Sequence, residues 1–208
     1  MALIDAVRAA NHQPTWRVFL DGQPVRALEG SVDLGFDTAS AAASVTLAAL
    51  PSGLANNGLR AQLEIRLGWN GYTTPSFRGW VEDVSFELWP ASVELKAAGY
   101  LKQTQYQYPN TLSYASSTDL AIVADLLSKA GVPDYSVEGE GTTSLGTLQP
   151  VTLSAGSPVF DLINRLDQLW GYKTFDSRDG VVLRRLISGV PSETAAFSYV
   201  QGQPSGAQ

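Results

Sequence analysis

Apolar and polar residues alternate one by one through much of the first hundred positions of this chain of 208 residues. In the clearest case, Leu63, Ile65 and Leu67 are interleaved with polar residues. Successive side chains of a β-strand point to opposite faces, so a period of two predicts strands with one buried face. The pattern recurs at residues 16–20, 32–36, 45–49, 77–88 and 93–97. Six strands without a strong helix among them predict an antiparallel sheet closed into a barrel or a sandwich.

The second half of the chain mixes helix and strand. Apolar residues at helical spacing predict one helix between a cap at Ser116 or Ser117 and a stop at Gly131. They predict a second helix between a cap at Ser157 and a stop at Gly171, followed by a β-hairpin over residues 172–186. The predicted fold class is α+β, mainly β. We expect a β-barrel domain in residues 1–105, an insertion-type α/β domain in 106–188 and an extended segment in 189–208.

Composition and charge exclude several kinds of function. The formal net charge is −6, whereas tight binding of nucleic acid needs a cationic surface. The chain has no cysteine, which excludes disulfides, thiol catalysis and cysteine-ligated metals. No apolar run is long enough for a membrane span or has the form of a signal peptide, so no membrane insertion is expected. The charged fraction of 16% suits a protein that buries much of its surface against partners.

The residues needed for catalysis are scarce. His12 is the single histidine, and no GxSxG motif supplies a nucleophile for it. Three pairs of carboxylates lie close together in the sequence: Glu82 with Asp83, Glu138 with Glu140, and Asp176 with Asp179. The first pair points to opposite faces of a predicted strand, the second lies in a glycine-rich loop, and the third flanks a predicted turn. We therefore predict no enzyme activity, no metal and no cofactor.

Aromatic residues cluster where the two halves of the chain meet. Four tyrosines lie between residues 100 and 114, and three tryptophans lie at predicted strand ends: Tyr100, Tyr106, Tyr108, Tyr114, Trp69, Trp80 and Trp89. Such residues either pack the link between the halves, anchor a contact between subunits, or form a platform for carbohydrate. As candidates for a subunit interface we take Tyr100, Tyr106, Tyr108, Trp80 and Trp89.

Two segments resemble a known family. Residues 76–100, SFRGWVEDVSFELWPASVELKAAGY, have the form F-x-G-x-[VI]-x-x-[VI], followed by a strand that ends in a small residue, Gly and an aromatic. Residues 156–186, GSPVFDLINRLDQLWGYKTFDSRDGVVLRRL, combine a helix, a G-[YF] pair and a hairpin. Both segments resemble the late control protein D family and related baseplate hub proteins of contractile phage tails. The resemblance covers about residues 15–187 and rests on degenerate apolar, glycine and aromatic positions.

The resemblance implies a structural subunit in the tail baseplate of a virion. Family members form a trimer whose tail-tube-like barrels continue the tube wall, carry the central spike and surround the channel through which DNA passes. The expected partners are further copies of the chain, the tail tube protein, the spike or tip protein and other baseplate proteins. Typical members hold two barrels per chain and this sequence shows one. A hexamer, half of a split hub and a piece of a longer protein therefore stay open beside the trimer.

Acidic residues on a channel wall would repel DNA phosphates and let DNA pass without specific binding. As candidates we take Asp33, Asp37, Glu64, Glu82 and Glu87. Two other functions stay open. One is a tail-tube or tube-initiator protein, against which the long α/β half argues. The other is a carbohydrate-binding tail module that would use the tyrosines and tryptophans.

Overall fold

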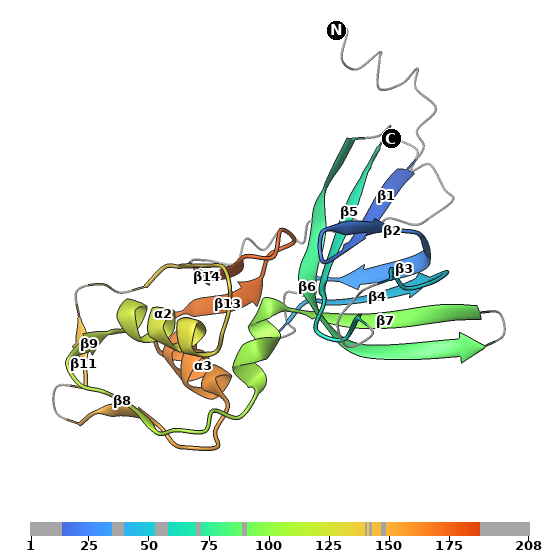
Figure 1. The fold of residues 1–208 in the computed structure, drawn as a ribbon. Helices are drawn as coiled ribbons and strands as arrows, with labels where there is room; N and C mark the ends of the chain where they lie inside the picture. Colours follow the sequence, from blue (N-terminus) through green and yellow to red (C-terminus); the bar gives the residue numbers. More distant parts are fainter. Residues whose placement is uncertain are drawn as a thin grey trace, which may run out of the picture.

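The computed structural model describes residues 14–34, 40–52, 58–69, 72–88, 91–139, 141, 143–146 and 149–187. A strand-rich half and a mixed half lie side by side, each with its own hydrophobic core (Figure 1). The predicted fold class, α+β and mainly β, is confirmed.

The strand-rich half is one antiparallel sheet of seven strands. In chain order they are β1 (Pro14–Leu20), β2 (Gln23–Val25), β3 (Ala27–Asp33), β4 (Ala42–Leu47), β5 (Gln62–Trp69), β6 (Tyr72–Leu88) and β7 (Ala91–Gly99). Their order across the sheet is β2-β1-β5-β6-β7-β4-β3. Asp21 and Gly22 form the two-residue turn between β1 and β2, and both have positive φ.

Strand β6 divides the sheet into two parts. Strands β2, β1 and β5 lie on one side of it, and β7, β4 and β3 lie on the other. Its first part pairs with β5 as far as Trp80, and its second part pairs with β7 from Gly79 onward. A bulge interrupts the pairing with β7 and leaves Glu82 as the extra residue between Val81 and Asp83. Because bulges bend and twist a strand, β6 passes from one half of the sheet to the other. The two hairpins, β5–β6 and β6–β7, point in different directions in Figure 1.

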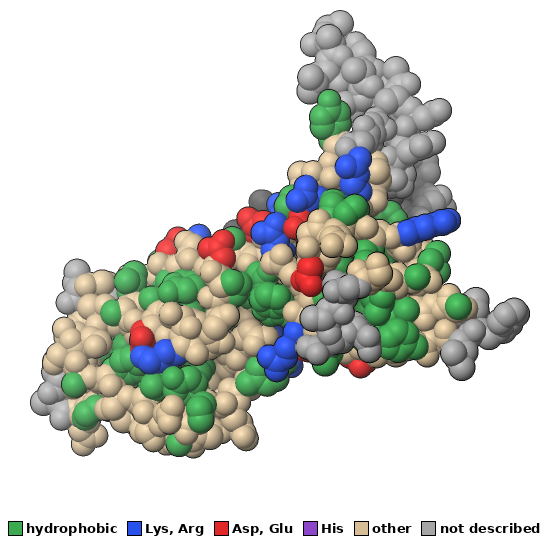
Figure 2. All heavy atoms as spheres, in the orientation of Figure 1, with side chains coloured by type: hydrophobic (Ala, Val, Ile, Leu, Met, Phe, Trp, Pro, Cys, Tyr) green, Lys and Arg blue, Asp and Glu red, His purple; other side chains and the backbone are tan. Residues whose placement is uncertain are grey.

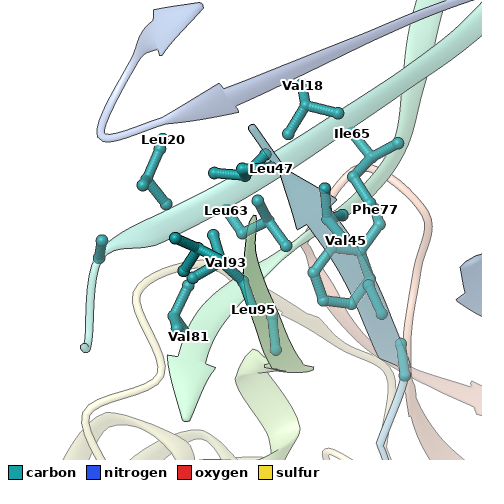
Figure 3. Packing of buried hydrophobic residues seen from close by; sticks show 14 residues of the cluster. Val18, Leu20, Val45, Leu47, Leu63, Ile65, Phe77, Val81, Val93 and Leu95 are labelled. Carbon is teal, nitrogen blue, oxygen red and sulfur yellow. The ribbon is translucent and has the colours of Figure 1, made fainter. Parts of the chain in front are cut away.

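The inner faces of the two parts of the sheet pack against each other. Buried side chains converge from both halves in Figure 3: Val18, Leu20, Leu63, Ile65 and Phe77 from one, and Val45, Leu47, Val93 and Leu95 from the other. The outer faces consequently point in opposite directions. No ladder joins β2 to β3 within the described residues, so hydrogen bonds do not close the sheet into a barrel. The backbone itself links these two outermost strands through Arg26.

The mixed half begins with a 3-10 helix, η2 (Tyr100–Gln105), and contains helices α2 (Asp119–Lys129) and α3 (Val159–Trp170). Its short strands are β8 (Leu112–Tyr114), β9 (Ser117–Thr118), β10 (Tyr135–Val137), β11 (Ser144–Leu145), β12 (Val151–Leu153), β13 (Tyr172–Asp176) and β14 (Val182–Leu186). The predicted hairpin is β13–β14, and β10 adds to it in parallel.

The ends of both helices are partly as predicted. Gly131 and Gly171 adopt the left-handed conformation after α2 and α3, with φ of 78° and 72°. The predicted caps at the N-termini were wrong. The Thr118 hydroxyl caps α2 by accepting from the N–H of Ala121, and α3 starts at Pro158 without a side-chain cap.

A buried arginine organises the core of the mixed half. The Arg184 guanidinium on β14 donates to Asp119 at 2.8 Å and to Asp167 at 2.6 Å. It lies 4.2 Å from the centre of the Tyr172 ring, and its Nη1 also donates to the carbonyl of Glu138. These contacts hold the start of α2, the end of α3 and the hairpin together.

Candidate functional site

The outer surface of strands β3, β4, β7 and the second part of β6 is acidic. Strand register places the following charged side chains on it: Glu29, Asp33, Asp83, Glu87, Glu94 and Lys96. Five carboxylates and one ammonium give this surface a formal charge of −4. We call it the acidic face.

Hydroxyl groups on neighbouring strands hold three of these carboxylates in place. Glu94 accepts from Ser44 at 3.1 Å and from Ser85 at 3.4 Å. Glu29 accepts from Thr46 at 3.2 Å, and Glu87 accepts from Ser92 at 3.4 Å. A groove of about 460 Å³ lies on this face, lined by the small residues Ala42, Ser44 and Ala98 and by the charged residues Asp33, Glu82, Lys96 and Lys102.

The opposite outer surface, on β1, β5 and the first part of β6, is basic. Register places Arg17, Arg66 and Arg78 on it together with Phe19 and Glu64. Three guanidiniums and one carboxylate give a formal charge of +2. We call it the arginine face. In Figure 2, Lys and Arg side chains gather over the part of the sheet where β1 and β5 lie in Figure 1.

Glu64 is the centre of the arginine face. Its carboxylate is paired with Arg66 and accepts from Nη2 of Arg78 at 2.9 Å. Burial on its own would raise the pKa of Glu64, but the hydrogen bonds and positive charges of Arg66 and Arg78 outweigh it and hold the pKa below its usual value. The Arg66 guanidinium also lies 4.9 Å from the centre of the Phe19 ring.

The structure separates the predicted channel-wall acids. Asp33 and Glu87 lie at opposite ends of the acidic face, whereas Glu64 lies on the other side of the sheet and is paired with two arginines. Glu82 is exposed at the bulge of β6. Asp37 lies outside the described residues. Sequence reasoning missed Glu29, Asp83 and Glu94, which strand register places on the same outer surface as Asp33 and Glu87.

A cleft of about 510 Å³ lies where the sheet meets the mixed half. Its lining includes Arg60, Trp80, Glu82, Gln103 and Tyr106. The Tyr106 hydroxyl donates to Glu82 at 2.7 Å. This hydrogen bond, assisted by partial burial, raises the pKa of Tyr106. The cleft thus combines aromatic rings with a carboxylate, a guanidinium and an amide.

The predicted interface aromatics occupy different positions. Tyr100 is 2% exposed and packs in the core of the mixed half, with its ring centre 5.5 Å from that of Trp80. Trp80 and Tyr108 are half-buried and pack against the same core. Tyr106 is 50% exposed and stays available to a partner. Trp89 and the side chain of Trp69 lie outside the described residues.

A carboxylate joins the sheet to the mixed half. Asp176 on β13 accepts from the backbone N–H of Ala41 at 3.0 Å and of Leu101 at 2.9 Å. Gly99 leaves the space for it, since a Cβ on Gly99 would lie 2.2 Å from Oδ2 of Asp176. Sequence reasoning predicted a local role for Asp176 beside a turn, whereas its partners lie 135 and 75 residues away.

Two further properties concern the described part of the chain alone. It contains no group of three or more His, Cys, Asp or Glu side chains placed to hold a metal ion. None of its helices combines the length and the apolar character needed to cross a membrane.

Comparison with known proteins gives a likeness in fold. The sequence matches no family model and no curated protein. Over 82% of its length the chain is similar to the tail protein from Neisseria meningitidis MC58, with a TM-score of 0.62 and 12% identity. Over 86% it is similar to the prophage MuSo2 43 kDa tail protein from Shewanella oneidensis, with a TM-score of 0.60 and 12% identity.

The likeness extends over part of each of these proteins. The chain covers 51% of the Neisseria protein and 57% of the Shewanella protein, about half of each. At this identity the comparison shows a shared fold. Membership of the late control protein D family stays a prediction from the sequence motifs.

Proposed function

We propose that this chain is a non-enzymatic structural subunit of a phage-type tail. The observation that carries the proposal is the likeness of its fold, over more than four fifths of its length, to two tail proteins. The sequence motifs around residues 76–100 and 156–186 support the same assignment independently.

Within the tail, the chain acts in the baseplate hub of a virion or a phage-like injection system. Copies form a trimeric or hexameric ring that caps the tail tube and connects it to the spike or tip protein. Other baseplate proteins surround the ring, and DNA passes through its channel without specific binding. The net charge of −6 supports this last point, because a chain with excess negative charge repels the phosphates of DNA.

Negative-stain electron microscopy of the native assembly tests the proposal. We expect a ring with threefold or sixfold symmetry and an axial channel. A protein that stays monomeric at every concentration, and that does not bind tail tube protein, would contradict it. A tube-initiator role would instead give rings that add tail tube protein on one side and do not bind a spike.

A carbohydrate-binding tail module is a second candidate, and the cleft beside Tyr106 favours it. Carbohydrate sites commonly place aromatic rings beside planar polar groups, and the cleft offers Trp80 and Tyr106 beside Glu82, Gln103 and Arg60. A glycan array tests it, with Tyr106→Ala as the matched variant, because Tyr106 lines the cleft and is exposed. Glycan binding that this variant abolishes would support the module, and an array without binding would exclude it.

A further inference from the structure

We propose that the acidic face of one copy of this chain packs against the arginine face of the next copy. The inference rests on the proposed assembly role and names the surfaces that build the assembly. Its basis is a charge of −4 on one outer face of the sheet and +2 on the other.

The positions of the two faces determine the type of contact. The halves of the sheet pack through their inner faces, so the outer faces point away from each other and cannot meet within one chain. A two-fold contact between identical faces would bring like charges together, which is unfavourable. A head-to-tail contact pairs opposite charges at every interface. Such contacts produce a ring when the rotation closes and a filament when it does not.

The two faces also carry groups that can bind one another. On the arginine face, Phe19 of β1 lies directly opposite Pro24 of β2, and the Arg66 guanidinium covers the Phe19 ring. On the acidic face, a groove is lined by small side chains and by four charged ones, Asp33, Glu82, Lys96 and Lys102. Asp33 and Glu82 are the groups in this groove that can accept hydrogen bonds from a guanidinium of the next copy.

The charged groups are held in place before any contact forms. Ser44, Ser85, Thr46 and Ser92 bind carboxylates of the acidic face, and Glu64 binds both Arg66 and Arg78. Less side-chain entropy is then lost on association, and loss of this freedom is a main cost of forming an interface.

For Asp33 and Glu87 this contact replaces the channel-wall role predicted from the sequence. The two roles have different consequences. Carboxylates on a channel wall affect the passage of DNA and leave assembly unchanged, whereas carboxylates in the contact control assembly itself.

Charge reversal tests the inference with the full chain. The acid-reversed variant carries Glu29→Lys, Asp83→Lys and Glu87→Lys, which changes the acidic face from −4 to +2, two charges per substitution. The arginine-reversed variant carries Arg17→Glu and Arg66→Glu, which changes the arginine face from +2 to −2. A combined variant carries all five substitutions and restores opposite charges. The control variant carries Asp134→Lys and Arg178→Glu, on exposed positions outside both faces.

Light scattering after gel filtration measures assembly, and circular dichroism verifies that each variant folds. We expect wild type, control and combined variant to assemble, and each single-face variant to self-associate at least about tenfold more weakly. Raising the salt concentration should weaken wild-type assembly, because salt screens exposed charges.

The outcomes separate the inference from the proposed function. If folded single-face variants assemble like wild type, the contact is wrong and the hub role stands. A second outcome is that the acid-reversed, arginine-reversed and combined variants all fail to assemble while the control assembles. These positions are then needed for a reason other than complementary charge, and the inference fails. If wild type never assembles, the inference and the homo-oligomeric ring both fail.

Discussion

The carboxylate of Asp176 accepts a hydrogen bond from the backbone N–H of Leu101 at 2.9 Å. Its other oxygen accepts from Ala41, directly before β4. One side chain of the β13–β14 hairpin thus fixes both the start of η2 and the entry to a sheet strand. This carboxylate therefore connects the sheet directly to the mixed half.

Replacing Asp176 with Ala should destabilise the protein by about 2–4 kcal/mol. The substitution leaves two buried N–H groups without partners, and each unsatisfied buried donor costs about 1–3 kcal/mol. Urea unfolding followed by fluorescence measures the loss. Asp179→Ala, at an exposed position three residues later, is the control and should change stability by less than about 0.5 kcal/mol. If Asp176→Ala loses as little stability as the control, the two buried hydrogen bonds contribute little.

Asp176 should also make stability depend on pH. Its burial raises the pKa, and this outweighs the hydrogen bonds from Leu101, Ala41 and Ser40. The folded protein then holds the proton more tightly than the unfolded chain. The contribution to stability is complete below the unfolded pKa of 3.8 and is lost as pH rises through the folded pKa. The free-energy difference between wild type and Asp176→Asn should therefore become less favourable to wild type as pH rises from about 3.5 to 7.

Glu64 should show the opposite dependence. Its folded pKa lies below the unfolded value of 4.5, so its contribution is present above 4.5 and is lost as pH falls through the folded pKa. Acid titration of unfolding should show a smaller loss of stability in Glu64→Gln than in wild type. Parallel curves for wild type and Glu64→Gln would mean that Arg66 and Arg78 do not stabilise the ionised carboxylate.

Local sequence patterns predicted the longer strands and both α-helices, but not the short strands or the surfaces. The period of two was sufficient for β5 and the glycine stops for α2 and α3, because each signal lies within a few residues. The three residues of β2 are too few to show a period. Both charged faces depend on strand register, which places Asp33 opposite Ala42 and Asp83 opposite Lys96. The role of Asp176 depends on partners far away in sequence, so no local pattern could indicate it.

Arg184 provides the strongest test of the mixed half. Its side chain is fully buried between Asp119 and Asp167, so Arg184→Met would leave two buried carboxylates without their cation. Removing one partner of a buried ion pair typically costs about 3–5 kcal/mol, and we expect a loss of that size in urea unfolding. Arg185→Met is the matched control, because Arg185 pairs with the exposed Glu138, and its loss should stay below about 1 kcal/mol. A triple variant, Arg184→Met with Asp119→Leu and Asp167→Leu, removes the buried charges together and should recover much of the stability. If Arg184→Met alone unfolds like wild type, the network does not hold α2, α3 and the hairpin together.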